Sequence, residues 1–177
     1  MSEYATMDRG QLLEALAAFA KNWLAHDGSW FLAVEERFGM DTAIELDAAA
    51  WARFAPAEAK RALDLLGIAP GGGLAALERV LGLRMYALIN PFRTEWAEGG
   101  KVLRFVTEAC RVQQTRRRKG MPDFPCKSVG EVEFSGFART VNPRIRVRCL
   151  ACPPDPEADG ACAWEFTLAD APNETPA

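Results

Sequence analysis

The spacing of apolar residues changes once along the chain, and this change constrains the fold more than any other feature. Up to Asn90-Pro91, apolar side chains recur every three or four residues, as they do on one face of a helix. After that point they alternate with polar side chains, which is typical of half-buried strands. Helices that precede strands predict an α+β fold, in which N-terminal helices are followed by an antiparallel sheet of about four strands interrupted by a helix.

The helical half divides into five predicted helices. Leu12, Leu16, Phe19 and Trp23 mark the first, which we expect to end at 26–28, where a glycine follows two polar residues. The remaining helices are expected at 30–38, 41–54, 56–67 and 74–88.

Alternating patterns in the second half predict the strands of the sheet, at 93–97, 101–114, 144–149 and 162–168. Between the second and third strands, an S-x-x-E capping box that begins at Ser128 predicts a helix running to about Val141. The last two strands are expected to form an antiparallel hairpin in which Cys149 and Cys162 both point inward.

The composition favours one ordinary globular domain spanning residues 1–177. We expect a helical part at about 8–90, a sheet part at about 91–169 and a loose tail at 170–177. The net charge of −3 argues against nucleic acid as a partner, and the basic run at 116–119 is expected to be a solvated turn. We find no apolar run long enough to span a membrane and no secretory signal, so we expect no membrane association and a cytoplasmic location.

The cysteines carry most of the functional information. There are five, and the last four are spaced C-x22-C-x2-C-x9-C. Clustered cysteines in a chain without an export signal are more often metal-binding or catalytic than disulfide-bonded. Four thiolates can complete a tetrahedron around zinc. The sequence therefore predicts zinc as a cofactor, held by Cys126, Cys149, Cys152 and Cys162.

Other interpretations of the cysteines stay open. Free cysteine is often a small buried apolar residue, a Cys-x2-Cys pair can be redox-active, and four cysteines can hold an iron–sulfur cluster. Cys110 is either a core residue or an extra ligand. Glu108 and Asp123 are candidates for carboxylates beside the metal.

A second candidate site surrounds the only histidine. His26 and Asp27 lie near several aromatic residues, including Trp30, and these residues could form an aromatic-walled pocket with a polar end. His26 could instead cap a helix at the surface or join the cysteines as a ligand. We therefore expect a small-molecule ligand as a partner. The many aromatic side chains would also allow an apolar interface, and hence a homodimer.

Three stretches carry a resemblance to known proteins: residues 20–31 (AKNWLAHDGSWF), residues 120–131 (GMPDFPCKSVGE), and the ending CLACPPD at 149–155 with CAWEF at 162–166. They resemble an uncharacterised bacterial and archaeal cytosolic family. More distantly, the order of elements is similar to L-2-amino-thiazoline-4-carboxylate hydrolase-like proteins and 4-vinyl-reductase-type ligand-binding domains. The second resemblance implies zinc at Cys126, at one or both of Cys149 and Cys152, and at Cys162, beside a small-molecule pocket.

Two functional hypotheses follow. The first is a zinc-containing small-molecule-binding or sensor domain whose cysteine site is closed and structural. The alternative is a metal-dependent hydrolase of a small cyclic amide-like or thiazoline substrate. It would need an open metal position and a proton-handling group, for which Asp123, Glu108 and His26 are the candidates. The two hypotheses leave open whether the protein is an enzyme.

Overall fold

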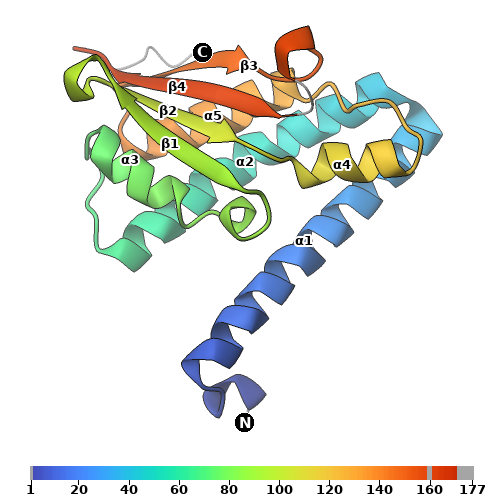
Figure 1. Ribbon diagram of the computed structural model, residues 1–177, viewed down its shortest axis with the longest axis horizontal. Coiled ribbons are helices and arrows are strands. Elements are labelled where there is room, and N and C mark those ends of the chain that lie inside the picture. The colour runs from blue at the N-terminus through green and yellow to red at the C-terminus, as the bar shows by residue number, and fades with distance from the viewer. Residues whose placement is uncertain (1, 159–160, 171–177) are drawn as a thin grey trace.

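The structure, a computed structural model, describes residues 2–158 and 161–170 and confirms the α+β fold (Figure 1). Helices fill the N-terminal half, and four strands and two more helices follow. The helices are η1 (Glu3–Ala5), α1 (Arg9–Phe38), α2 (Met40–Leu66), α3 (Leu74–Leu81), η2 (Met85–Leu88), η3 (Glu98–Gly100), α4 (Arg111–Arg118), α5 (Lys127–Val141) and η4 (Pro156–Ala158), and the strands are β1 (Phe92–Ala97), β2 (Val102–Thr107), β3 (Ile145–Ala151) and β4 (Cys162–Leu168).

Helix α1 is one continuous helix, so the predicted break at 26–28 is wrong. Gly28 inside a helix costs only about 1 kcal/mol relative to alanine, and the packing of the flanking turns outweighs that cost. The helix begins with a capping box between Asp8 and Gln11 and ends at Gly39, whose φ of 85° suits glycine. Its first half projects away from the rest of the molecule (Figure 1).

Helix α2 also continues through a predicted boundary, since Pro56 lies inside it rather than at the start of a new helix. A proline inside a helix loses one backbone hydrogen bond. Here Pro56 packs against α5, where its Cδ atom would lie 3.6 Å from a Cβ built on Gly136. Tertiary packing between α2 and α5 therefore maintains the helix.

The segment after β2 differs most from the expectation. The strand predicted at 101–114 ends at Thr107. The basic run is helical up to Arg118 rather than a turn, with Arg116 buried and Arg117, Arg118 and Lys119 exposed to solvent as expected. The side chain of Asn90 accepts a hydrogen bond from the amide of Arg111, 3.0 Å away, and so satisfies a free amide of the first helical turn. The next helix, α5, starts earlier than Ser128, with Cys126 at its N-cap position.

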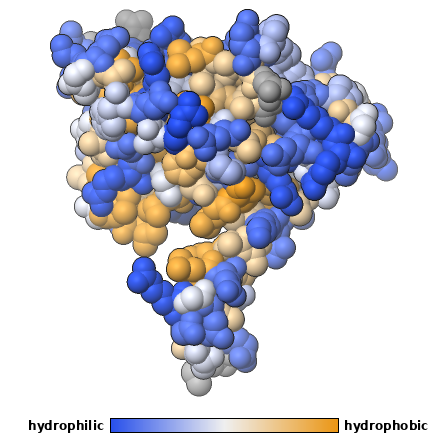
Figure 2. Space-filling view, in the orientation of Figure 1, coloured by the Kyte–Doolittle hydropathy of each residue, from blue (hydrophilic) through white to orange (hydrophobic). Residues whose placement is uncertain are grey.

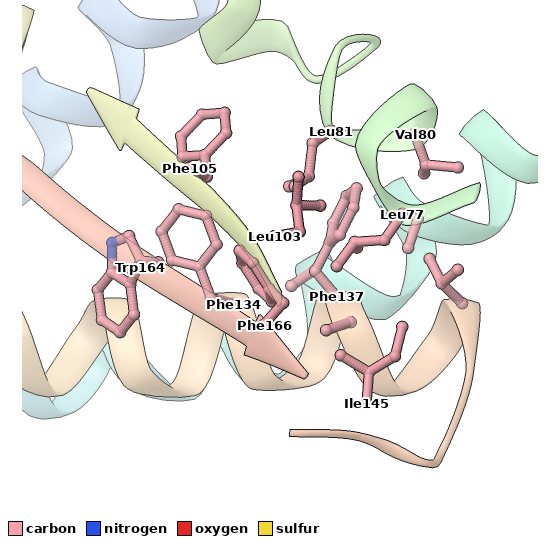
Figure 3. Close-up of a cluster of buried hydrophobic side chains, with 14 of the residues drawn as sticks. Leu77, Val80, Leu81, Leu103, Phe105, Phe134, Phe137, Ile145, Trp164 and Phe166 are labelled. Atoms are coloured by element: carbon pink, nitrogen blue, oxygen red, sulfur yellow. The ribbon is translucent and has the colours of Figure 1, made fainter. Parts of the chain in front are cut away.

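The sheet is antiparallel with strand order β1-β2-β4-β3. The predicted hairpin of the last two strands is confirmed, and a bulge lies between Cys149 and Ala151. Helix α5 packs on the sheet and against α2, and the core fills the space between them with Trp164, Phe134, Phe137 and Phe166, among others (Figure 3). None of the described helices is both long and apolar enough to span a membrane.

Candidate functional site

A cavity of about 620 Å³ lies between α1, α4, α5 and the sheet. Its walls are mainly apolar and aromatic and include Phe31, Phe105, Phe134 and Trp164. Ligand pockets in proteins typically measure about 300–1,000 Å³ and have such walls with a few polar groups. The cavity therefore has the size and the lining of a small-molecule site.

One end of the cavity is acidic and deeply placed. Asp27 on α1, Asp47 on α2 and Glu133 on α5 all line it. Arg84, which is 3% exposed, forms an ion pair with Glu133 and a second one with Glu58, with 2.9 Å between Arg84 Nε and Glu58 Oε2. The guanidinium also lies over aromatic rings, with its Cζ atom 4.9–5.8 Å from four ring centroids. This end thus has three carboxyl groups and one buried cation on the cavity wall, with Glu58 behind them as a partner of Arg84.

The crowding of acids shifts their protonation. Burial, followed by repulsion from Asp27 and Glu133, raises the pKa of Asp47 from 3.8 to about 7. Burial also raises the pKa of Asp27 and the pKa of Glu133, although Arg84 opposes the second shift. Near neutral pH the Asp47 carboxyl group is therefore partly protonated, and in its protonated form it can donate a hydrogen bond to a ligand.

Aromatic rings surround the acidic end. Tyr86 lines the cavity, and its ring centroid lies 5.4 Å from that of Trp23 and 6.0 Å from that of Trp51. Burial, together with the neighbouring carboxylates, raises the pKa of Tyr86 well above its usual value. Its hydroxyl therefore stays protonated, and a neutral phenol is a suitable hydrogen-bond partner for a polar group of a ligand.

The cavity wall also carries thiols. Cys126, Cys152 and Cys162 all line it, and the sulfur atoms of Cys126 and Cys152 are 3.6 Å apart. A hydrogen bond from the thiol of Cys152 lowers the pKa of Cys162 to about 7, because it stabilises the thiolate. The Sγ atom of Cys162 also lies 3.4 Å from the hydroxyl oxygen of Thr107.

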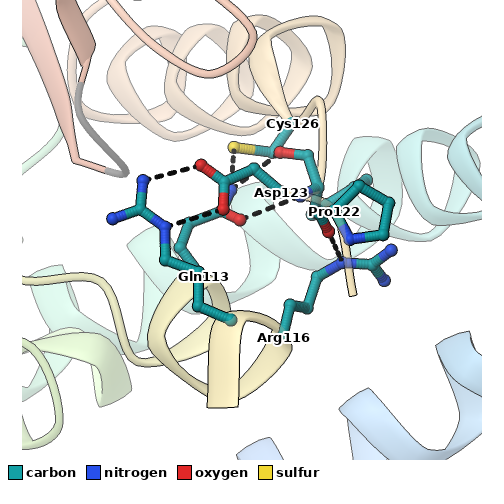
Figure 4. A network of polar contacts seen from close by, with 7 residues as sticks. Gln113, Arg116, Pro122, Asp123 and Cys126 are labelled. Atoms are coloured by element: carbon teal, nitrogen blue, oxygen red, sulfur yellow. Dashed lines mark hydrogen bonds and ion pairs between the residues drawn. The ribbon is translucent and has the colours of Figure 1, made fainter. Parts of the chain in front are cut away.

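A polar network holds the segment that precedes Cys126 (Figure 4). Gln113, which is 2% exposed, donates to the carbonyl of Phe124 at 2.7 Å and accepts from the amide of Phe124 at 2.8 Å. Its side-chain nitrogen also lies 3.6 Å from Cys126 Sγ. Arg116 donates to the carbonyl of Pro122 at 2.7 Å. Helix α4 therefore anchors the loop that leads into α5.

A second set of contacts holds Cys152. The backbone carbonyl of Pro153 accepts from the amide of Lys127, and the Lys127 ammonium forms an ion pair with Asp155 at 2.9 Å. The Asp155 carboxylate accepts a hydrogen bond from the amide of Cys152 at 3.2 Å. The β3–β4 connection is thereby fastened to the first turn of α5, which explains why Cys152 is only 1% exposed.

The zinc-binding function predicted from the cysteines is corrected by the structure. Within residues 2–158 and 161–170, no group of three or more His, Cys, Asp or Glu side chains is arranged to hold a metal ion. Cys149 lies apart from the cavity, in a surface depression with Lys127 and Glu131. Its strand β3 is at the edge of the sheet, and the bulge beyond Cys149 changes the register before Cys152. The alternative of a metal-dependent hydrolase depended on the same site and is withdrawn with it.

The other candidates separate into two groups. Asp27 and Cys110 line the cavity, and burial raises the pKa of Cys110 to about 11. His26 and Trp30 are exposed on α1, and neither lines the cavity, so they do not form the expected pocket wall with Asp27.

The carboxylates expected beside the metal have other partners. Glu108 lies 3.4 Å from Arg93 in an exposed ion pair, and Asp123 accepts two hydrogen bonds from Arg117, which lower its pKa.

Several cavity residues were missed from the sequence. Asp47 lies three residues after Ile44 and four before Trp51, so it shares their helix face, and Glu133 shares a face with Phe137 in the same way. A lone acid on an apolar helix face is the signal that could have identified both. Arg84 carries no such signal, since it lies in the turn before η2, and Gln113 carries none because its segment was expected to be a strand and is part of α4.

Two solved structures give the scale of the structural likeness. The phenol-responsive sensory domain of the transcription activator PoxR, solved with phenol, is 15% identical, with a TM-score of 0.53 over 86% of this chain and 74% of that chain. A trafficking protein particle complex subunit 3 from Naegleria fowleri, solved covalently bound to palmitic acid, is 9% identical, with a TM-score of 0.48 over 94% of this chain and all of that chain. The likeness to the PoxR domain is one of fold.

Sequence comparison identifies the family directly. No curated protein matches the chain. Residues 5–168, which include every helix and strand from α1 to β4, match a family of unknown function, DUF6125. This agrees with the expectation of an uncharacterised family. The chain therefore belongs to the family of unknown function DUF6125.

Proposed function

We propose that the protein is a small-molecule-binding domain, and that its ligand is a compact, largely apolar molecule bound in the cavity of about 620 Å³. The observation that carries this proposal is the cavity itself. A water-filled space of this size with aromatic walls exposes apolar surface, and a ligand that displaces the water gains about 25 cal/mol for each Å² of apolar surface that it buries.

The polar groups that line the cavity indicate what else the ligand would carry. The Tyr86 hydroxyl and the protonated form of Asp47 can donate hydrogen bonds, and their oxygen atoms can also accept them. A ring or short chain with one hydroxyl or similar neutral group would satisfy these partners. A sensory role is supported by the fold, because the PoxR domain is described as phenol-responsive and was solved with phenol. The expected similarity in the order of elements to 4-vinyl-reductase-type ligand-binding domains points the same way.

Gly28 offers a direct test, because it lines the cavity and a Cβ built on it meets no atom within 4 Å. Gly28→Phe would place a ring in the cavity without disturbing the helix, since phenylalanine has a higher helix propensity than glycine. Gly28→Ala is the matched control, because it also raises helix propensity but adds only a methyl group.

The experiment measures thermal stabilisation and calorimetric binding of phenol, indole, benzoate and benzylamine. We expect at least one probe to bind wild type and Gly28→Ala, and Gly28→Phe to weaken that binding about tenfold or more, which is about 1.4 kcal/mol. The proposal fails if no probe binds, or if Gly28→Phe binds as tightly as wild type.

A further inference from the structure

The first half of α1 extends beyond the body of the protein and has an uncovered apolar face (Figure 1). We call residues 9–19 the stalk. Leu12, Leu13, Leu16 and Phe19 are between 40% and 54% exposed. Tyr4 of η1 packs against Phe19, with 5.7 Å between ring centroids, and is itself 47% exposed. Five large apolar side chains are therefore grouped on one exposed helical segment.

The same helix face is covered elsewhere. Leu16 lies four residues before Ala20 and seven before Trp23, so all three are on one side of α1. Ala20 is 3% exposed, and Trp23 packs on rings of α2 and η2. The apolar face thus runs without interruption from the body onto the stalk, where the described chain no longer covers it.

The stalk is the first part of the continuous helix α1 and lacks the packing that supports the rest of it. Most helical stability in proteins comes from packing of an apolar face, so a partner that covers the stalk would stabilise it. Figure 2 shows hydrophobic side chains on the stalk and, across a notch, on the facing part of the body. Leu83, which precedes η2, and Leu88, the last residue of η2, are 43% and 48% exposed, and η2 contacts α1.

The area of this surface fits a protein partner. The four apolar stalk side chains and Tyr4 are each about half exposed, which together gives on the order of 500 Å² of apolar surface. A standard interface buries about 800 Å² per partner, of which about 56–65% is apolar, or about 450–520 Å². We propose that a second copy of this chain packs on the stalk, with the two stalks antiparallel around a twofold axis. Such a pairing uses one patch twice and closes on itself.

The charge pattern favours a protein over a membrane surface as the occupant. Helices that lie on membranes carry many Lys and Arg residues on the polar face. The polar positions of the stalk and its ends carry Asp8, Arg9, Glu14 and Lys21, which are equally divided in sign. No net positive face is therefore available to attract anionic lipid.

The test is sedimentation velocity on the full chain over a range of micromolar concentrations. We expect wild type to be a dimer. The double variant Leu16→Glu/Phe19→Glu should raise the dimer dissociation constant by about thirtyfold or more, because it places charges at the centre of the interface. Ala18→Glu is the matched control, since Ala18 is exposed on the opposite side of the same helix and its variant should remain dimeric.

Circular dichroism verifies that each variant is folded, and the wild-type result does not depend on any variant. A wild type that is monomeric at every concentration would overturn the proposal. So would a dimer that the double variant leaves unchanged, or a monomer that cosediments with anionic vesicles.

Discussion

Replacing Arg84 by methionine tests the electrostatic account of the cavity. Arg84 is the buried cation of the acidic end, in ion pairs with Glu58 and Glu133. Methionine preserves much of the packing against the surrounding rings but leaves two carboxylates buried without their partner. Breaking a buried ion pair in this way typically costs about 3–5 kcal/mol, so we expect the free energy of unfolding at pH 7.5 to fall by about that amount.

The pH dependence of this loss is the sharper part of the prediction. Burial already raises the pKa of Glu133 in the wild type, where Arg84 holds the shift down. Without Arg84 the folded-state pKa rises further, so the folded variant binds a proton more tightly than the unfolded chain does. The free energy of unfolding of the variant is therefore highest at low pH and falls as the pH rises, by about 1.4 kcal/mol per pH unit for one such carboxyl group.

Urea unfolding at pH 5.5 and 7.5 measures this difference. We expect the free energy of unfolding of Arg84→Met to lie closer to that of wild type at pH 5.5 than at pH 7.5, by about 2 kcal/mol. Leu77→Ala is the control, because Leu77 is fully buried and uncharged, and its loss of about 2–5 kcal/mol should be the same at both pH values. If the two variants show the same pH dependence, the assignment of Arg84 as the compensating charge is refuted.

Two further predictions concern neighbouring parts of the structure. The pKa of Asp47 is raised from 3.8 to about 7, so the free energy of unfolding of the wild type falls as the pH rises from 3.8 to 7. Asp47→Asn should match the wild-type free energy of unfolding at pH 4 and exceed it by about 1–3 kcal/mol at pH 8. Thermal unfolding at both pH values measures the difference. A Cβ on Gly130 would lie 2.6 Å from the ring of Trp164, whereas one on Gly136 meets nothing closer than 3.6 Å. In chemical unfolding, Gly130→Ala should therefore lower the free energy of unfolding by about 1–3 kcal/mol, and Gly136→Ala should raise it by up to about 1 kcal/mol. Equal effects at the two positions would contradict this packing.

Local patterns predicted the elements better than their ends. The alternation around Cys149 and Cys162 correctly gave the final hairpin, because a strand pattern with one buried face specifies its own register. The breaks expected at 26–28 and at Pro56 are absent, since packing of α1 and α2 outweighs the local preference of one glycine and one proline. The strand predicted through 114 ended early because an asparagine side chain from a distant loop caps α4.

The site was less accessible to sequence reasoning. The sequence singled out the cysteines, and three of the four predicted zinc ligands do line one cavity. Cys149 points to the inward face of the sheet as expected, opposite Trp164, but the spacing did not reveal that it lies in a separate depression beside α5. The acidic end was missed, apart from Asp27. It is assembled from α1, α2 and α5 and from the turn that holds Arg84, so it depends on tertiary contacts that no single segment encodes.

The most direct test of the proposed function is a crystal soaked with a brominated phenol, in which anomalous scattering locates the bromine. The account predicts a bromine peak inside the cavity, between the rings of Phe31, Phe105 and Trp164. A bromine found only on the surface, with the cavity filled by side chains, would contradict the proposal that this protein binds a small apolar ligand there.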